Sequence, residues 1–381
     1  PCTLTNLFQP KTPLLPLTTC FIVWLTQPTC DTYRYHLVIR YHKMNCKPRV
    51  VVFSIIPRLG EIVKKLLPHE NIKVVQFQAE MSAKYGRAVS EEEVSQLQDA
   101  EVLLADNNAF QQFADKLPSL RWFQGTWAGL EGLADYFRDK ANPSYLMSRM
   151  SSNTFSQLMS EYVVGQIIAH ERAWRLTDKK QAEVSWWHSD RVASYRSLQD
   201  LSVVVLGTGE IGQEIGRALR AFKCHTSGFS RTAHDPAQLQ HAFDKLYNGS
   251  EGLIAAVSNS DYIVSCLPCT PDTTGLLSAS LLQHARQGSV LINIGRGNVV
   301  TEEDLIKCLE EGPLAAAVLD VFQEEPLPAT SKLWTHPKVV ITPHCAGVSR
   351  AQDVAATFVE NYKRFTTGQP LNFQVDISKG Y

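Results

Sequence analysis

Three ionisable side chains in the second half of this 381-residue chain each follow an apolar run: Arg296, Glu325 and His344. The planar fork of an arginine can bind a carboxylate and polarise a neighbouring carbonyl. A histidine is the natural proton donor near neutral pH, and a carboxylate on its far ring nitrogen fixes the tautomer and favours the imidazolium. Together they suit hydride transfer to the carbonyl carbon of a 2-oxo acid. In the reverse direction the neutral imidazole would take the hydroxyl proton.

Each of the three residues also has a plainer interpretation. His344 could be an ordinary loop histidine after Pro343, Glu325 could be a solvated charge, and Arg296 could pair with a surface acid. Their shared position favours the functional interpretation. In a parallel sheet all carboxyl ends of the strands lie at one edge, where ligands bind, so residues far apart in sequence converge there. We therefore expect one site that contains all three.

A glycine-rich segment indicates the partner for this chemistry. The apolar run 202–206 leads directly into a Gly-x-Gly-x-x-Gly motif, and a helical pattern follows. The motif comprises Gly207, Thr208, Gly209, Glu210, Ile211 and Gly212. Its first glycine makes the tight turn, its second lets a pyrophosphate approach the backbone, and its third lets helix and strand pack closely. In this context we expect a dinucleotide with its phosphates at the helix N-terminus, rather than a plain strand-to-helix turn.

The end of the next predicted strand favours NADP(H) as that dinucleotide. NAD-dependent enzymes place an acidic residue there, about 20 residues beyond the motif. This chain has Ser230, Arg231 and Thr232 instead. A guanidinium flanked by two hydroxyls would bind the 2′-phosphate of NADP(H), which a carboxylate would repel. NAD(H) remains the alternative, in which Arg231 is a solvated surface residue.

Alternating strand and helix patterns must position these residues. Strands are predicted at 49–53, 72–77, 101–105 and 120–123, and again at 202–206, 224–229, 262–266, 290–294, 315–321 and 339–342; helices are predicted at 59–67, 153–175 and 354–365. This alternation predicts an α/β fold with two Rossmann-like, doubly wound parallel-sheet domains and the active site in the cleft between them. Residues 44–152 and 348–381 would form a substrate domain, and 153–347 a dinucleotide-binding domain with the linking helix.

Composition argues against several other classes. The net charge is −1 and no long Lys/Arg run occurs, so neither nucleic acid nor a membrane is expected as a partner. The apolar run 14–26 is too short to span a bilayer. Cys266 and Cys269 form a Cys-x-x-Cys pair without a second pair at zinc-ligand spacing, so no metal site is expected. The nine scattered cysteines are typical of reduced thiols in the cytoplasm.

Residues 1–43 differ from the rest of the chain. They are rich in proline, contain three of the nine cysteines and hold a single acidic residue, Asp31. We interpret them as an extension outside the core, with the working protein starting near Met44; an organellar leader is the alternative.

Four segments of the chain resemble the D-isomer-specific 2-hydroxyacid dehydrogenase family. They are the glycine motif 207–212, Asn-Ile-Gly-Arg-Gly at 293–297, Asp-Val-Phe-Gln-Glu-Glu-Pro at 320–326, and Thr-Pro-His at 342–344. The resemblance covers nearly all of residues 47–373. Segments 161–163 and 327–337 look most like the glyoxylate/hydroxypyruvate reductase A branch of the family.

This resemblance implies roles for residues that chemistry alone does not assign. It implies that the catalytic residues are Arg296, Glu325 and His344, that Leu267, Pro268 and Asp320 contact the nicotinamide half of the cofactor, and that Trp127, Ala128 and Gly129 form the loop that holds the substrate carboxylate. The branch prefers NADPH, in agreement with Arg231. Family members usually dimerise through the nucleotide domain, so a homodimer is expected.

Two other functions fit parts of the pattern. An NAD(H)-linked dehydrogenase of a bulkier D-2-hydroxy acid would use the same three residues, and the ratio of kcat/KM for NADPH and NADH separates it from the first hypothesis. A nucleotide-sensing scaffold, like the transcriptional corepressors that share this fold, would bind the cofactor without turning over 2-oxo acids. Such scaffolds usually carry an acidic residue at the ribose, and this chain has none at 230–232.

Overall fold

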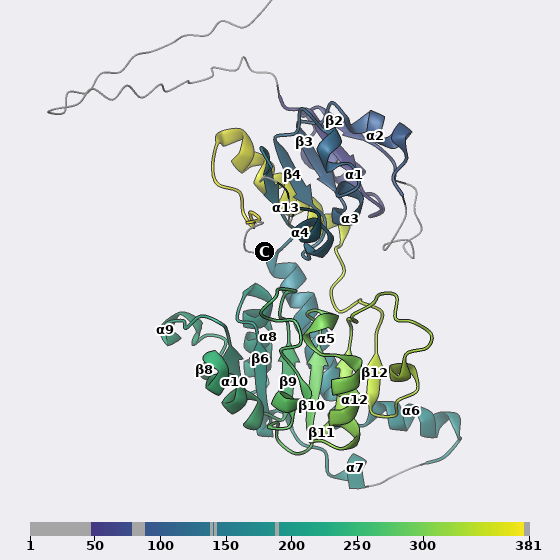
Figure 1. Ribbon diagram of the computed structural model, residues 1–381, viewed down its shortest axis with the longest axis vertical. Helices are drawn as coiled ribbons and strands as arrows, with labels where there is room; N and C mark the ends of the chain where they lie inside the picture. Colours follow the sequence, from purple (N-terminus) through teal and green to yellow (C-terminus); the bar gives the residue numbers. More distant parts are fainter. Residues whose placement is uncertain (1–46, 78–87, 138–139, 141–142, 187–189, 377–381) are drawn as a thin grey trace, which may run out of the picture. The chain divides into compact units, whose positions relative to one another are not determined.

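Two parallel β-sheets, each covered by helices, make up the part of the chain that the computed structural model describes (Figure 1). The described residues are 47–77, 88–137, 140, 143–186 and 190–376. Pro48–Tyr381 forms one unit, separate from Pro1–Lys47, and the structure below is that of the former. The predicted extension at 1–43 lies outside the described residues.

The first sheet is built from the N-terminal part of the chain. Its strands are β1 (Val50–Phe53), β2 (Ile72–Val74), β3 (Val102–Ala105), β4 (Trp122–Gly125) and β5 (Leu146–Ser148). They run parallel in the order β2-β1-β3-β4-β5. The elements between them are α1 (Leu59–Leu66), α2 (Glu91–Leu97), α3 (Asn107–Phe110), η2 (Ala114–Lys116) and α4 (Glu131–Phe137). The strand order reverses at β1 and β3, as in doubly wound sheets that bind ligands at that point.

The last helix of the chain, α13 (Ala351–Thr367), returns to this first sheet. The ring of Phe358 stacks on the buried indole of Trp122 in β4, with 5.2 Å between ring centroids. The hydroxyl of Tyr362 donates to Glu70 over 2.7 Å. Burial of such large aromatic faces fixes α13 to residues more than 200 positions earlier in the chain.

The second sheet contains the glycine motif. Its strands are β6 (Ser202–Leu206), β7 (His225–Phe229), β8 (Lys245–Tyr247), β9 (Tyr262–Ser265), β10 (Ser289–Asn293), β11 (Leu314–Leu319) and β12 (Val339–Ile341). They are parallel in the order β12-β11-β10-β9-β6-β7-β8. The order therefore reverses between β6 and β9, which is the dinucleotide-binding order of Rossmann sheets.

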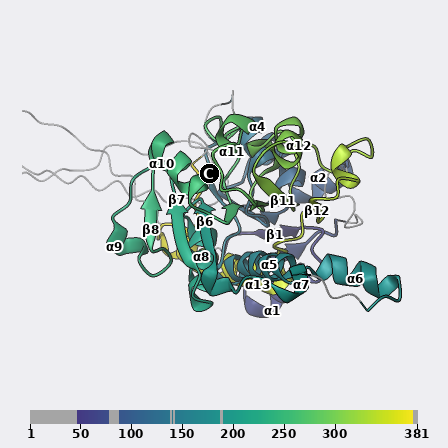
Figure 2. The same cartoon turned by 90° about the horizontal axis from the view of Figure 1, so that it is seen from below.

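Helices cover both faces of this second sheet, as Figure 2 shows. The helical elements of this part of the chain are α5 (Asn153–Glu171), α6 (Trp174–Ala182), α7 (Asp190–Ala193), η3 (Leu198–Asp200), α8 (Glu210–Ala221), α9 (Pro236–Leu239), α10 (Gly249–Ser258), α11 (Ala279–Leu282), η4 (Gly297–Val299), α12 (Glu302–Glu310) and η5 (Lys332–Trp334). Of these, α6 buries no residue and projects away from the sheet. Alternate residues of β6 face opposite layers: Val203 and Val205 belong to the core with α5 and α8, and Val204 and Leu206 to the core with α10, α11 and α12. Burial on both faces explains why these strands are continuous apolar runs.

The predicted fold class is confirmed by these two parallel α/β sheets. Strand β6 has the predicted bounds, and most other predicted strands differ by one or two residues. The prediction of one helix over 153–175 is wrong at its end. Helix α5 stops at Glu171 because Ala173 adopts a left-handed conformation (φ 53°), and α6 starts in a new direction. The predicted domain boundaries at 152/153 and 347/348 remain predictions.

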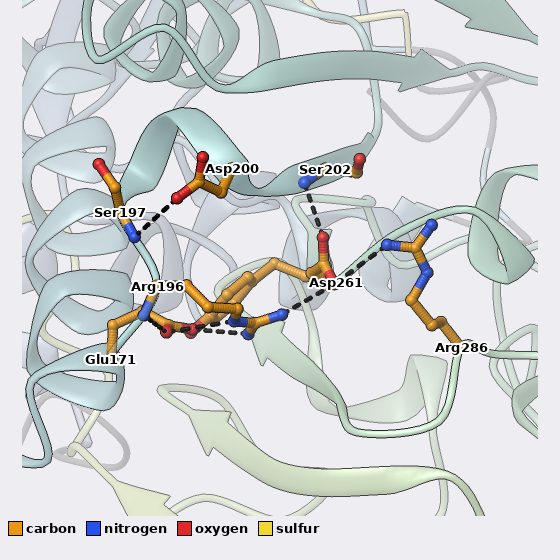
Figure 3. Close-up of polar contacts among 8 residues, drawn as sticks. Glu171, Arg196, Ser197, Asp200, Ser202, Asp261 and Arg286 are labelled. Atoms are coloured by element: carbon orange, nitrogen blue, oxygen red, sulfur yellow. Dashed lines mark hydrogen bonds and ion pairs between the residues drawn. The ribbon is translucent and has the colours of Figure 1, made fainter. Parts of the chain in front are cut away.

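An ion-pair network holds the end of α5 against the amino ends of β6 and β9 (Figure 3). Arg196 binds Glu171 over 2.7 Å and Asp261 over 2.9 Å, and the Tyr262 hydroxyl donates to Glu171 over 2.6 Å. Asp261 also accepts from the backbone N–H of Ser202, which opens β6. Burial opposes ionisation of Glu171, but the hydrogen bonds from Arg196 and Tyr262 outweigh it and hold the pKa of Glu171 below its usual value.

Candidate active site

The three predicted catalytic residues follow three neighbouring strands of the second sheet. Arg296 follows β10, Glu325 follows β11 and His344 follows β12, and β10-β11-β12 are adjacent and parallel. Their carboxyl ends therefore lie at one edge of the sheet, as the sequence predicted.

His344 and Glu325 form a hydrogen-bonded pair. The imidazole Nδ1 lies 2.7 Å from Glu325 Oε2, and the second carboxylate oxygen accepts the backbone N–H of Phe322 over 2.9 Å. The Glu325 side chain is only 16% exposed and that of His344 33%, so the pair is largely shielded from water. A carboxylate at Nδ1 places the proton on that nitrogen in the neutral ring and fixes the orientation of the imidazole. This is the arrangement of an oriented acid–base histidine.

The backbone at His344 is held in a conformation that a non-glycine residue rarely adopts. Its φ is 52°, and its N–H donates to the carbonyl oxygens of Asp320 and Thr342. The buried Asp320 carboxylate accepts the N–H groups of Cys345 over 2.8 Å and Ala346 over 2.9 Å, and the Thr342 hydroxyl over 2.6 Å. Asp320 therefore fastens the turn that carries the imidazole, a role that sequence reasoning missed. Its contact with nicotinamide remains a prediction.

Arg296 lies in a turn that only glycine neighbours allow. A methyl group on Gly295 would lie 2.6 Å from the Leu267 carbonyl oxygen, and one on Gly297 would overlap the backbone of Phe322. The Asn293 amide spans the turn, donating to the Arg296 carbonyl over 2.9 Å and accepting the Gly295 N–H over 3.2 Å. The Arg296 guanidinium donates to the Gly295 carbonyl over 2.6 Å. Backbone packing thus fixes the position of the turn from which the Arg296 side chain extends. The Asn293 amide stabilises this turn, a role that sequence reasoning did not single out.

The glycine motif has the geometry of a phosphate-binding turn. Gly207 has a φ of 108°, which favours glycine, and a methyl group on Gly212 would overlap the Gly207 carbonyl oxygen. A methyl group on Gly209 would meet nothing within 4 Å. Helix α8 begins at Glu210 and runs to Ala221, so its N-terminal N–H groups lie at this turn. The open face at Gly209 is the space that a pyrophosphate needs, and the residues present fit a dinucleotide.

Ser230, Arg231 and Thr232 follow β7, the strand beside β6. The Arg231 guanidinium forms an ion pair with Asp272 over 2.9 Å, and both side chains are 66% exposed. Asp272 lies in the loop after β9, on the other side of β6. Asp272 therefore pairs with Arg231 although the two residues follow different strands. Sequence reasoning did not detect this pair. The pair is solvent-exposed and worth about 1 kcal/mol or less, so an incoming phosphate could replace it.

Leu267 and Pro268 follow β9 directly. Leu267 is buried against the Gly295 backbone, and the Pro268 carbonyl accepts the Thr273 hydroxyl over 2.6 Å. Cys266, before them, packs its sulfur 3.2 Å from the Leu206 and Gly207 carbonyl oxygens, and burial raises the pKa of its thiol to about 12. Such a thiol stays protonated and unreactive at neutral pH.

The predicted substrate loop belongs to the first sheet. Trp127, Ala128 and Gly129 follow β4 and are partly buried. The Gly129 carbonyl accepts the Asn107 amide over 2.6 Å, and the Trp127 carbonyl accepts the Met150 N–H over 3.1 Å. These contacts define the shape of the loop, and its contact with a carboxylate remains a prediction.

Within the described ranges, the helices are all too short or too polar to cross a membrane. No three His, Cys, Asp or Glu side chains there are grouped so that they could hold a metal ion.

Comparisons with known proteins agree with this geometry. Residues 164–346 match the model of the D-isomer specific 2-hydroxyacid dehydrogenase, NAD binding domain. A glyoxylate/hydroxypyruvate reductase A of Escherichia fergusonii is 31% identical over 239 residues, which are 63% of this chain and 74% of the relative.

Solved structures extend the likeness to both sheets. A D-isomer specific 2-hydroxyacid dehydrogenase family protein of Aeromonas salmonicida is 32% identical with a TM-score of 0.74, over 87% of this chain and all of that one. An NADPH-dependent glyoxylate/hydroxypyruvate reductase of Sinorhizobium meliloti, solved with NADP and sulfate, is 27% identical with a TM-score of 0.72, over 88% of this chain and all of that one. The resemblance inferred from the motifs is confirmed: the chain belongs to the D-isomer-specific 2-hydroxyacid dehydrogenase family.

Proposed function

We propose that this protein reduces a small 2-oxo acid, such as glyoxylate or hydroxypyruvate, to the D-2-hydroxy acid with NADPH. The observation that carries the proposal is the His344–Glu325 pair, 2.7 Å apart, at the same sheet edge as the glycine turn. The names of two relatives, from Escherichia fergusonii and Sinorhizobium meliloti, support the substrate class.

The chain supplies the proton and the orientation for this reaction. When bound, the reduced nicotinamide supplies the hydride to C2 of the 2-oxo acid. The imidazolium of His344 gives its Nε2 proton to the carbonyl oxygen. The C=O double bond thereby becomes a C–O single bond, with a new C–H bond at C2 and a new O–H bond. Glu325 keeps the Nδ1–H in place and stabilises the charged ring before the transfer. In oxidation the neutral ring accepts the hydroxyl proton at Nε2.

Arg296 and the loop of residues 127–129 bind the substrate in this proposal. The Arg296 fork pairs with the substrate carboxylate and draws electron density from the adjacent carbonyl. The backbone N–H groups of Trp127, Ala128 and Gly129 hold the same carboxylate from the first sheet. Asn107 sets the shape of this loop, because its amide donates to the Gly129 carbonyl.

The cofactor preference in this proposal depends on Arg231. Its guanidinium would exchange Asp272 for the 2′-phosphate of NADP(H), with Ser230 and Thr232 beside it. The phosphate carries more charge than the carboxylate and is therefore the stronger partner for the guanidinium, while the exposed Asp272 side chain can turn into solvent. Two solved relatives, from Sinorhizobium meliloti and Xanthobacter autotrophicus, contain NADP and NADPH respectively. Leu267, Pro268 and Asp320 would lie at the nicotinamide end.

A homodimer is part of the proposal. Helix α6 has no buried residue, and the segment that follows it exposes Val184 to 94% and Trp186 completely. A fully exposed tryptophan on a projecting helix-and-loop segment is typical of an interface with another chain. A second copy of this chain is the occupant we propose, and sedimentation velocity tests it. Trp186→Glu should shift the protein from dimer to monomer, and a wild-type monomer at micromolar concentration would contradict the dimer.

A cytoplasmic location is also proposed. The five described cysteines, Cys224, Cys266, Cys269, Cys308 and Cys345, are free thiols. Unpaired thiols persist in reducing compartments.

A steady-state screen tests the proposed reaction. Purified protein is assayed with glyoxylate, hydroxypyruvate and bulkier 2-oxo acids, each with NADPH and with NADH, by the loss of absorbance of the reduced cofactor. We expect the highest kcat/KM for a two- or three-carbon acid with NADPH. An NADH preference together with a bulkier substrate would instead support the NAD(H)-linked alternative. Tight cofactor binding without turnover of any acid would refute an enzyme and support a sensing scaffold.

A further inference from the structure

The hydroxyl of Tyr162, on helix α5, meets the segment that carries His344. It lies 2.6 Å from the Thr342 hydroxyl oxygen. Thr342 follows β12 and precedes His344 by two residues. The reaction proposed above gives no role to either hydroxyl.

The direction of these hydrogen bonds follows from the acceptors. Thr342 Oγ1 also lies 2.6 Å from Asp320 Oδ1, and that carboxylate already receives the N–H groups of Cys345 and Ala346. A carboxylate can only accept, so Thr342 donates its proton to Asp320. Thr342 then has no second proton, and Tyr162 must donate to Thr342. Burial raises the pKa of Tyr162, so its hydroxyl keeps the proton that it donates.

This relay ends on the group that holds the His344 turn. Asp320 receives the N–H of residue 344 at its carbonyl oxygen and those of 345 and 346 at its carboxylate. Three successive N–H groups thus point at one residue. The left-handed backbone of His344 is strained and persists only where its surroundings fix it. The Asp320 carboxylate fixes it, and Thr342 and Tyr162 fix the carboxylate.

Helix α5 touches the same segment at a second place. A methyl group on Gly347 would lie 2.5 Å from the Met159 sulfur and 3.0 Å from the Phe155 ring. Residues 342 and 347 are therefore both tied to α5, the first by a hydrogen bond and the second by close packing, with His344 between them. Figure 2 shows α5 on one side of the second sheet.

We propose that Tyr162 and Thr342 are positioning residues for His344, acting through the Asp320 carboxylate. The inference rests on the proposed function, because it assigns these hydroxyls to the proton-transfer step of that reaction. Neither residue touches a reactant. They keep the imidazole at the distance and angle at which it meets Glu325 and the substrate carbonyl.

Three variants test this proposal: Tyr162→Phe, Thr342→Val and Thr342→Ser. The first removes one hydroxyl and keeps the ring, and we expect kcat for glyoxylate to fall roughly two- to tenfold, the effect of one net hydrogen bond. Thr342→Val removes both the hydrogen bond to Asp320 Oδ1 and the one from the Tyr162 hydroxyl, and kcat should fall more than about tenfold. Thr342→Ser restores the hydroxyl without the methyl group, and its kcat should return to within about twofold of wild type. The dissociation constant for NADPH should stay unchanged in all three, since the glycine turn is untouched.

Tyr362→Phe is the matched control. It also removes one tyrosine hydroxyl and keeps the ring, but that hydroxyl is on helix α13 and donates to the carboxylate of Glu70. Its thermal stability should fall about as far as that of Tyr162→Phe, while its kcat should equal that of wild type. This comparison separates positioning of His344 from a general loss of stability.

The outcomes distinguish failure of the positioning role from failure of the proposed reaction. If wild type reduces glyoxylate and the Tyr162→Phe and Thr342→Val variants keep its kcat, the positioning role is overturned while the reaction stands. The same holds if Thr342→Ser is as slow as Thr342→Val. If wild type turns over no 2-oxo acid, the proposed function itself fails.

Discussion

Replacing Gly209 or Gly212 by alanine adds the same methyl group at two positions of one turn, with different expected effects. At Gly212 the methyl group would overlap the Gly207 carbonyl oxygen and lie 3.3 Å from a Val205 methyl group. At Gly209 it would meet no atom within 4 Å, and the backbone there is extended (φ −72°, ψ −170°), which alanine adopts without strain. The first substitution should therefore damage the fold, and the second should damage only what binds at the turn.

The magnitudes follow from these contacts. Overpacking a buried site typically costs about 1–3 kcal/mol, and an overlap with backbone cannot be relieved by a side-chain rotation, so we expect about 3 kcal/mol for Gly212→Ala. For Gly209→Ala, the gain from a less flexible unfolded chain offsets the weaker helix start, and the stability should change by less than about 1 kcal/mol. The same methyl group excludes the pyrophosphate from the N–H groups of α8. Loss of one such charge-assisted hydrogen bond, about 1.5–3 kcal/mol, weakens NADPH binding roughly 10- to 150-fold.

Two measurements on each variant check this reasoning. Urea unfolding gives the stability of the protein without cofactor, and quenching of protein fluorescence by NADPH gives the dissociation constant. We expect Gly209→Ala to unfold at the wild-type urea midpoint and to bind NADPH weakly. If it bound NADPH as wild type does, the pyrophosphate would not lie against this face of the turn. If it unfolded as easily as Gly212→Ala, the contacts read from the turn would be wrong.

Further predictions concern the site and its support. His344→Ala and Arg296→Ala should each abolish most reduction of glyoxylate while leaving the NADPH dissociation constant nearly unchanged; near-normal turnover by either would refute the site assignment. Arg231→Ala should raise KM for NADPH by roughly tenfold, the effect of one charge-assisted bond, and hardly change KM for NADH, as paired kinetics would show. Glu171→Gln should lower the unfolding free energy at pH 7 by about 2 kcal/mol, because it removes the charge-assisted hydrogen bonds that the buried Glu171 carboxylate accepts from Arg196 and Tyr262. Since the pKa of Glu171 is depressed in the folded protein, its contribution is fully present above the unfolded-state value near 4.5 and is lost as the pH falls through the lower folded-state pKa, so the difference between wild type and variant in urea unfolding should shrink as the pH is lowered from 5.

Much of the fold follows from one property of the sequence. Strands buried on both faces are unbroken apolar runs, so β6, β9 and β10 could be located almost to the residue. The short strands β5 and β8 lie at the edges of their sheets and carry exposed or half-exposed residues, so they have no such run and were not predicted. Pairing of an edge strand depends on the side-chain contacts with the neighbouring strand, which the local sequence does not encode.

In the candidate site, too, positions that depend on the strands could be predicted, and contacts that depend on the loops could not. That Arg296, Glu325 and His344 lie beyond the carboxyl ends of strands in one parallel sheet could be predicted from strand direction alone. The hydrogen bonds that Asp320 accepts come mainly from backbone N–H groups, whose positions depend on loop conformation. Asp272 reaches Arg231 across β6, from a loop 41 residues later. Such partners become visible only when the loops are placed.

The contact between Gly297 and Phe322 limits how this enzyme could be redesigned. The turn with Arg296 touches the backbone that also donates a hydrogen bond to Glu325, so neither loop can be lengthened or repacked without moving the other. An engineer who wants a different substrate range should leave both turns intact.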